Sequence, residues 1–367
     1  MINEIWLRDK KLLGELINKN AVDNKRKGIL EKQIFALYLL EKLLEANIYF
    51  IFKGGTSLLL LLDEVHRFST DIDILITKPN LEKVKESFKN FVGENCIFTK
   101  YETDIRTDTK FPKIHFRFYY SSVYNESYIL LDAVFEDNPY LEIIQKEIKA
   151  NIIETNSPYI LVNIPSITDI MIDKLTAFAP NTIGVKYFRE YGNIKKERKR
   201  EVIKQLFDVN ELFLSCKNFS NLNIRYQKLA KFELEQRELS GSTYIDCLKD
   251  SLDTLLIYLS KGSRNKKVYN YLLDGLNGFK VFPNILVGAV YMTLACVNII
   301  ELISFVLCDN QELYESIYEK SKEKILYDNF VKEKQLQAVA KSAKAISHNE
   351  WNRVIRSLRV ISNYIDY

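Results

Sequence analysis

The sequence predicts an α+β fold in which a mixed sheet of about five strands with flanking helices is followed by an all-α region. Over residues 48–135, short β-branched and aromatic runs alternate with helical patterns, and after Pro165 helical periodicity continues almost alone. The chain has 367 residues, of which 47% are hydrophobic, so it can bury a sizeable core. We expect two domains, residues 1–160 and 161–367, with the boundary near 155–165.

Each element of the N-terminal domain follows from a local pattern. Strands are expected at residues 48–52, 72–76, 97–101, 114–120 and 128–135. Helices are expected at residues 29–46, 56–62 and 80–92. The pair Gly54-Gly55 ends the first strand, and Thr56 can cap the helix that follows. The last two strands should pair as a hairpin.

The all-α region opens at Ser166, which with Asp169 resembles a capping box for a helix that extends to about Phe178. Further along, residues 285–300 are almost entirely apolar. This stretch is shorter than the roughly 20 residues that a membrane span needs. We therefore expect a buried core helix there and no membrane association.

Composition narrows the class of protein. The net charge of +4 is too mild to indicate nucleic-acid binding by itself. Five cysteines are scattered without metal-ligand spacing, which favours reduced thiols and a cytoplasmic location. The first residues lack the basic and apolar pattern of a signal peptide. The histidines, His66, His115 and His348, are dispersed and suggest no catalytic role.

Two aspartates, Asp71 and Asp73, are the most informative residues. Side chains two apart on a strand point to the same face, so these carboxylates should lie together while Ile72, Ile74 and Ile76 point to the other face, into the core. Paired carboxylates can hold a hard cation such as Mg²⁺. The alternative is a strand end with solvated acids.

A third acid, Asp132, interrupts the otherwise apolar run of residues 128–135. A lone buried carboxylate is costly, so this side chain needs a partner. A metal ion shared with Asp71 and Asp73 would supply one. A hydrogen bond to a polar group of a neighbouring strand is the alternative.

The glycine pair adds a second kind of chemistry. A glycine turn lets backbone N–H groups approach phosphates closely. The order of strand, Gly54-Gly55-Thr56, helix and a second strand with Asp71 and Asp73 brings phosphate donors beside metal ligands.

Lys53-Gly-Gly-Thr-Ser-Leu58 followed by Arg67-Phe-Ser-Thr-Asp-Ile-Asp73 resembles the signature of nucleotidyltransferases with the polymerase-β-like fold, and among them the AbiEii/AbiGii-type toxins of toxin–antitoxin systems. Two later segments are also similar to this family. Residues 173–177 look like its lysine-bearing helix, and residues 204–208 look like its Arg-Asp-x-x-Asp segment, although Gln205 stands where the family usually has an acid. The resemblance covers roughly residues 30–215.

The resemblance implies roles for individual residues. Asp71 and Asp73 would bind Mg²⁺ or Mn²⁺, with Asp132 as the third acid. Lys174 would contact phosphate and Asp208 would position or activate the acceptor, so that the helical domain completes the active site. The residues implied in nucleotide binding are Lys53, Gly54, Gly55, Thr56, Ser57, Arg67 and Ser69.

Residues 186–204 are rich in lysine and arginine and include the aromatic residues Tyr187, Phe188 and Tyr191. Cations beside aromatic rings suit RNA, whose phosphates and bases they can contact. A solvated helix face is the alternative. The candidate RNA-binding residues are Lys195, Lys196, Arg198, Lys199 and Arg200.

Together these patterns predict a Mg²⁺-dependent nucleotidyltransferase toxin of a toxin–antitoxin or phage-defence (abortive infection) system. It would transfer a nucleoside monophosphate from an NTP to RNA, with the tRNA 3′ end as the leading acceptor, and so block translation. Its expected partners are an NTP, tRNA or another RNA, and a cognate antitoxin protein. Two alternatives stay open, a nucleotidyltransferase for an aminoglycoside-like small molecule and a non-catalytic nucleotide-binding interaction protein.

Overall fold

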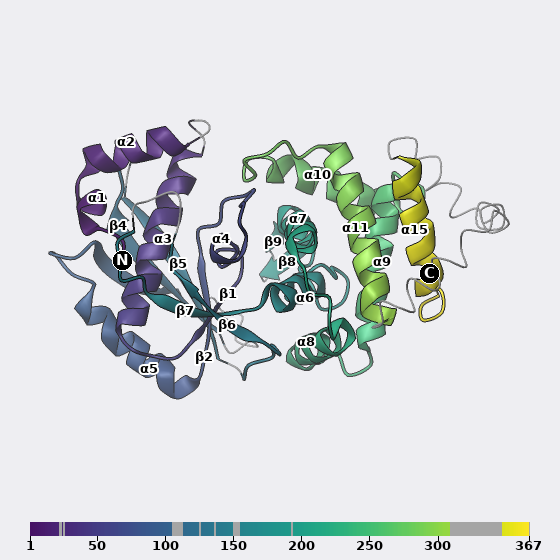
Figure 1. Ribbon diagram of the computed structural model, residues 1–367, viewed down its shortest axis with the longest axis horizontal. Coiled ribbons are helices and arrows are strands. Elements are labelled where there is room, and N and C mark those ends of the chain that lie inside the picture. The colour runs from purple at the N-terminus through teal and green to yellow at the C-terminus, as the bar shows by residue number, and fades with distance from the viewer. Residues whose placement is uncertain are drawn as a thin grey trace. The chain divides into compact units, whose positions relative to one another are not determined.

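The computed structural model describes residues 1–21, 24, 26–104, 113–124, 126–135, 137–149, 155–191, 194–308 and 347–366. The chain divides into two compact units. The first contains Met1–Ser166 and Val281–Ile285, and the second contains Ile167–Lys280 and Leu286–Tyr367. Figure 1 follows the chain from the N-terminal elements of the first unit to α15 near the C-terminus.

The first unit is built on a five-stranded mixed sheet, as predicted. Its strands are β1 (Ile51–Lys53), β2 (Ile72–Ile76), β3 (Phe98–Asp104), β4 (Lys113–Ser121) and β5 (Glu126–Phe135). Their order is β1-β2-β5-β4-β3, and every pair is antiparallel except β2 with β5. The predicted hairpin of the last two strands is the β4–β5 pair.

Helices flank this sheet. They are α1 (Glu4–Arg8), α2 (Lys10–Asn20), α3 (Lys27–Glu45), α4 (Leu58–Leu61), α5 (Lys78–Ser87) and the 3₁₀-helix η1 (Phe88–Asn90). The predicted helix at 56–62 is only one turn long, and α5 begins before Pro79 because proline is well accommodated in a first turn.

The core of the first unit lies on one face of the sheet, against α3. Ile72, Ile74 and Ile76 of β2 are buried there, as their alternation predicts. Phe35 of α3 stacks on Tyr120 of β4 with ring centroids 3.7 Å apart. Figure 1 shows α3 running along the sheet. The opposite face of the sheet is therefore left for polar side chains.

The helices α1 and α2 and the strands β6 and β7 of the first unit were not predicted. The strands β6 (Ile143–Glu147) and β7 (Leu161–Pro165) form a separate antiparallel pair. β7 contacts β1, and β6 contacts α4. These strands therefore support the segment that carries the glycine pair.

A short return of the chain completes the first unit. Residues 281–285 lie beside the segment that precedes β2, where the Phe68 N–H donates to the Phe282 carbonyl (3.2 Å) and the Asn284 N–H donates to the His66 carbonyl (3.0 Å). The Asn284 side chain also donates to the Val65 carbonyl (3.0 Å). These bonds fix the main chain around Arg67.

The second unit is mainly helical. Its described helices are α6 (Ile167–Ala177), α7 (Lys199–Ser215), α8 (Leu222–Gln236), α9 (Tyr244–Leu259), α10 (Lys266–Phe279), α11 (Ala289–Cys308) and α15 (His348–Ile361). Helix α11 packs against α7, α9 and α15. The helix predicted from Ser166 to about Phe178 is α6.

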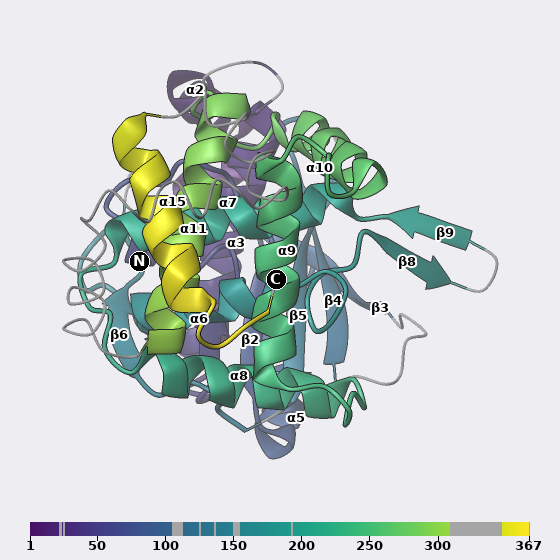
Figure 2. The same ribbon diagram turned by 90° about the vertical axis from the view of Figure 1, so that its right-hand side faces the viewer.

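A β-hairpin interrupts this helical unit, which is a difference from the all-α expectation. Its strands are β8 (Phe188–Tyr191) and β9 (Ile194–Glu197), and they pair only with each other in the described structure. Figure 2 shows the hairpin as a two-stranded ribbon that extends beyond the helices of its unit.

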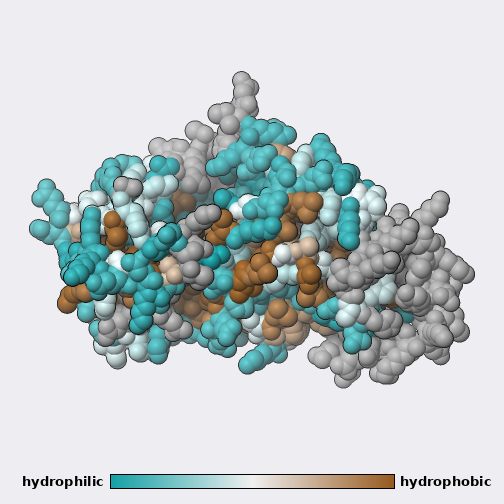
Figure 3. All heavy atoms as spheres, turned by 90° about the horizontal axis from the view of Figure 1, so that it is seen from above, coloured by the Kyte–Doolittle hydropathy of each residue, from teal (hydrophilic) through white to brown (hydrophobic). Residues whose placement is uncertain are grey.

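Among the described residues, α11 is the one helix long and apolar enough to cross a membrane, with a mean hydropathy of 2.0. Of that apolar window, 67% is buried inside the protein, as expected of a core helix. Its first turn is more open, since Val290 is exposed. On the face seen in Figure 3, hydrophobic residues lie among hydrophilic ones.

Candidate active site

The sheet face opposite the α3 core carries a row of polar side chains at one level of the register. Asp73 of β2 is paired with Lys53 of β1 on one side and with Asp132 of β5 on the other. Asp132 is paired in turn with His115 of β4. Directly paired residues share a face, and neighbouring strands are about 4.8 Å apart, so the two carboxylates are neighbours. We call Lys53, Asp73, Asp132 and His115 the polar row.

Asp132 is buried and its two oxygens have cationic or polar partners on β4. The Lys113 ammonium lies 2.6 Å from Oδ2, and His115 Nδ1 hydrogen-bonds Oδ1. Burial alone would raise the pKa of the Asp132 carboxyl, but the His115 hydrogen bond and the Lys113 charge outweigh it and the pKa is lowered. The Asp132 side chain is therefore held as a carboxylate. Its partners lie on the neighbouring strand β4, which was the alternative to a shared metal ion in the sequence analysis.

Asp71 precedes β2 and is exposed, whereas Asp73 is half-buried. The Thr56 hydroxyl donates to the Asp71 carbonyl (2.6 Å), and the Thr70 hydroxyl donates to its carboxylate (3.3 Å). Thr56 is itself fully buried. Thr56 therefore ties the glycine turn to the aspartate segment.

The glycine pair is required by close packing. Gly54 has φ +79°, and a Cβ there would lie 2.1 Å from Asp73 Oδ2. A Cβ at Gly55 would lie 2.6 Å from Arg67 Nη2 and 2.8 Å from Ser69 Oγ. No side chain fits at either position without displacing these groups. The two segments that together resemble the family signature, residues 53–58 and 67–73, are thus in direct contact.

The remaining predicted nucleotide-binding side chains help to hold this turn. The Ser57 hydroxyl is fully buried and donates to the Gly54 carbonyl (2.9 Å). Arg67 is 4% exposed and donates to the Phe68 carbonyl (3.0 Å). Lys53 lies over the Tyr140 ring, with its ammonium 5.7 Å from the ring centroid.

The donor set suits a hard divalent cation, since Asp71 and Asp73 offer carboxylate oxygens next to the glycine turn. In the described part of the chain, no three His, Cys, Asp or Glu side chains are grouped so that they could hold a metal ion together.

In the second unit, Lys174 of α6 and Asp208 of α7 form an ion pair of 3.5 Å. Their side chains are 9% and 1% exposed, so both charges are buried. Asp208 therefore does not lie on a polar helix face. The two residues that the resemblance singles out in this region are partners.

The five candidate RNA-binding residues have different environments. The Lys195 ammonium lies 4.4 Å from the Phe188 ring centroid, and Lys199 is bonded to Glu197 (3.0 Å) and Asp274 (3.1 Å). Of the rest, Arg200 pairs with Glu201, Lys196 is exposed on β9, and Arg198 precedes α7.

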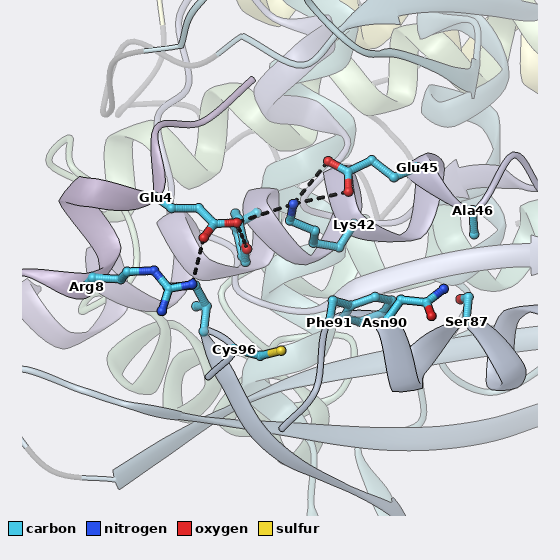
Figure 4. A pocket seen from close by; sticks show the side chains of 11 residues that line it. Glu4, Arg8, Lys42, Glu45, Ala46, Ser87, Asn90, Phe91 and Cys96 are labelled. Atoms are coloured by element: carbon cyan, nitrogen blue, oxygen red, sulfur yellow. Dashed lines mark hydrogen bonds and ion pairs between the residues drawn. The ribbon is translucent and has the colours of Figure 1, made fainter. Parts of the chain in front are cut away.

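A separate pocket of about 340 Å³ lies between α1, α3, η1 and the start of β3. Figure 4 shows that its charged groups pair with one another, Lys42 with Glu45 (3.1 Å) and Arg8 with Glu4 (2.9 Å). None of the predicted site residues lines it. This pocket is therefore distinct from the polar row.

His115 is the site residue that sequence reasoning missed. Its signal was present in the alternation of β4, where Phe116, Phe118 and Tyr120 are buried and the odd-numbered residues take the polar face. With β4 paired to β5, that alternation places His115 beside Asp132.

The sheet, the glycine turn and the paired aspartates belong to a nucleotidyltransferase. The family described as "Nucleotidyl transferase AbiEii toxin, Type IV TA system" matches residues 38–266, more than half of the chain. The chain belongs to this family, and it is therefore a nucleotidyltransferase toxin of a type IV toxin–antitoxin system.

Similar solved structures are remote in sequence. MenT4, a nucleotidyltransferase toxin from Mycobacterium tuberculosis, has 13% identity and a TM-score of 0.47 and covers 91% of this chain and 99% of its own. JHP933 from Helicobacter pylori has 15% identity and a TM-score of 0.41 and covers 80% and 97%. No curated protein sequence matches the chain.

Proposed function

We propose that this toxin transfers a nucleoside monophosphate from an NTP to a hydroxyl of RNA, with Mg²⁺ at Asp71 and Asp73 and with release of pyrophosphate. The observation that carries the proposal is the packing of the Asp73 carboxylate against Gly54, with Asp132 in register beside it. Such an arrangement suits a metal-bound triphosphate, because it combines carboxylate ligands with a main chain free of side-chain bulk.

Each group of the chain would have one task. Asp71 and Asp73 would hold the cation, which would neutralise charge on the phosphates when bound. The main chain at Gly54 and Gly55 would receive the triphosphate, and Arg67, buried behind Gly55, would keep the turn in shape. Lys174 and Asp208 stay predictions from the family resemblance, for phosphate contact and for acceptor positioning.

RNA is the acceptor that the charges of the β8–β9 hairpin favour. In the hairpin register, Arg189 is directly opposite Lys196, whereas Glu190 is opposite Lys195. One face of the ribbon thus combines two cations, as phosphate binding would require. A tRNA 3′ end is the leading acceptor, and blocked translation is the expected consequence.

The test is transfer of label. Purified protein is incubated with Mg²⁺, tRNA and each α-³²P-labelled NTP, and the RNA is resolved on a gel. We expect labelled tRNA from at least one NTP, and loss of labelling in Asp71→Asn. Asp63→Asn is the matched control, because Asp63 is an exposed acid just upstream of the same segment.

Other outcomes would identify the alternatives. Label on a small aminoglycoside-like molecule but on no RNA would favour the small-molecule enzyme. Toxicity in cells that is unchanged by Asp71→Asn, with no transfer to any acceptor, would favour a non-catalytic interaction protein. The type IV classification also implies an antitoxin, so co-expression of the neighbouring gene should relieve toxicity.

A further inference from the structure

Lys113 places an ammonium group in direct contact with the polar row, at Asp132. It is the first residue of β4, two positions before His115 and on the same face. Its Nζ lies 2.6 Å from Asp132 Oδ2, while the lysine side chain is 31% exposed and that of Asp132 is 11% exposed. The contact therefore joins a nearly buried carboxylate to a side chain that reaches solvent.

The electrostatics explain why a cation is needed there. Asp73 and Asp132 are directly paired on neighbouring parallel strands, so two carboxylates share one face at about the 4.8 Å strand spacing. Like charges at that spacing repel, more strongly where solvent is excluded. The Lys113 ammonium offsets the charge of Asp132. A divalent cation at these carboxylates would do the same and would repel the ammonium.

We propose that Lys113 is a counter-ion that holds Asp132 while no divalent cation is bound, and that it gives up this contact when the cation binds. The inference rests on the proposed metal site at Asp71 and Asp73. The long, partly exposed lysine stem lets its ammonium move into solvent without unfolding β4. Lys113 is thus a positioning residue that sets the affinity for the metal, and Asp132 becomes a ligand only after its release.

Binding of Mn²⁺, followed by electron paramagnetic resonance of the free ion, tests this without any turnover. We expect Lys113→Met to bind Mn²⁺ about tenfold more tightly than the wild type, because the cation no longer competes with a charge-assisted hydrogen bond. Lys113→Arg, which keeps the charge, should not bind more tightly. Lys100→Met is the matched control on β3, where Lys100 pairs with Glu102 at 3.1 Å, and its affinity should be that of the wild type.

Thermal melting is a second measurement, and it reports the loss of stability when Lys113 is replaced. Without Mn²⁺, Lys113→Met should melt below the wild type, because the Asp132 charge loses its partner, and Mn²⁺ should raise its melting temperature more than that of the wild type. Equal or weaker Mn²⁺ affinity in Lys113→Met, with binding still lost in Asp71→Asn, would overturn the role of Lys113 alone. Wild-type binding that Asp71→Asn leaves unchanged would overturn both this role and the proposed metal site.

Discussion

At the scale of single residues, the site depends on the absence of a side chain at Gly54 as much as on the carboxylate of Asp73. Gly54 has a positive φ, and a Cβ there would lie only 2.1 Å from Asp73 Oδ2, so no other residue fits at this position. A substitution at Gly54 therefore tests packing at the site, and substitutions of charged residues test its electrostatics.

Gly54→Ala should move the Asp73 carboxylate and strain the turn. We expect nucleotidyl transfer to fall by about a hundredfold, the effect typical of a displacement of about 1 Å in an active site. The left-handed backbone should cost about 1–2 kcal/mol of stability. Transfer assays and thermal melts measure the two effects. Gly28→Ala in α3 is the control, because a Cβ there meets no heavy atom within 4 Å; equal activity of both variants would contradict the prediction.

The buried pair of Lys174 and Asp208 allows stability to be separated from chemistry. Lys174→Met leaves the Asp208 charge buried without its partner, which should cost about 3 kcal/mol or more. The double variant Lys174→Met/Asp208→Asn removes both charges and should recover most of that loss. If the two residues take part in the reaction, the recovered protein stays inactive. A stable and active double variant would restrict the pair to a structural role.

Asp250 of α9 provides a pH test in the second unit. Its carboxylate accepts hydrogen bonds from the main-chain N–H groups of Asn181 (2.7 Å) and Thr182 (2.8 Å), yet burial dominates and the pKa of Asp250 is raised above 3.8. A raised pKa in the folded state means that stability is greatest below the unfolded pKa and declines as pH rises through the folded one. The stability of the wild type relative to Asp250→Asn should therefore be greatest near pH 3.5 and smaller at pH 7. Urea unfolding at several pH values measures it, and a constant difference would count against it.

How far the site could be predicted depends on the range of each interaction. The shared direction expected of Asp71 and Asp73 follows from strand periodicity, and Ile72, Ile74 and Ile76 are buried as that periodicity requires. The contacts of Asp132 with Lys113 and His115 can be predicted only if the β4–β5 register is known, and no local sequence pattern determines that register. The contact of Gly55 with Arg67 is set by tertiary packing and could be inferred only from family resemblance.

At the scale of elements, the hairpin β8–β9 shows where local patterns fail. Its lysines and glutamates have low strand propensity, so residues 186–204 resemble a charged helix face in the sequence. In the structure, Phe188 instead packs against Tyr271 of α10, with ring centroids 5.0 Å apart, and this contact anchors the hairpin. The strands β6 and β7 were missed for a related reason, because each is only five residues long and mixed in polarity.

The lysines at the β8–β9 hairpin differ in exposure and in ion pairing. Lys196 is exposed and has no ion-pair partner in the described structure, whereas Lys199 is nearly enclosed between Glu197 and Asp274. Lys196→Glu should weaken RNA binding and lower the slope of log affinity against log salt by about one. Lys231→Glu on α8 is the control, since Lys231 is 78% exposed and pairs only weakly, at 3.9 Å. Equal binding of the two variants would exclude the hairpin face as an RNA contact.

At the scale of the whole molecule, the chain leaves the first unit at Ser166 and returns to it for Val281–Ile285. Nothing in the local sequence marks this return, because the segment lies between two helical patterns. Its main-chain bonds to residues 65–68 connect the segment before Asp71 to a distant part of the chain. Fold class could be predicted from periodicity, but this connection could not.

Asn284→Ala in the full chain should loosen this connection. Loss of the side-chain bond to the Val65 carbonyl should speed amide hydrogen exchange at Phe68 and Asn284 about fivefold, as expected for a hydrogen bond worth about 1 kcal/mol. The amide of Cys216, which bonds the Leu212 carbonyl at the end of α7, should exchange as in the wild type. Exchange by mass spectrometry distinguishes these outcomes, and unchanged rates at Phe68 would refute the role of the side chain.

The return of residues 281–285 has a consequence during protein synthesis. A ribosome makes residues 65–68 early, but their hydrogen-bonding partners at 282–284 emerge only after all of Ile167–Lys280 has been translated. A nascent or prematurely released chain therefore lacks the contacts that fix the backbone around Arg67. For a toxin, this delays the finished glycine turn until residues 282–284 have been translated.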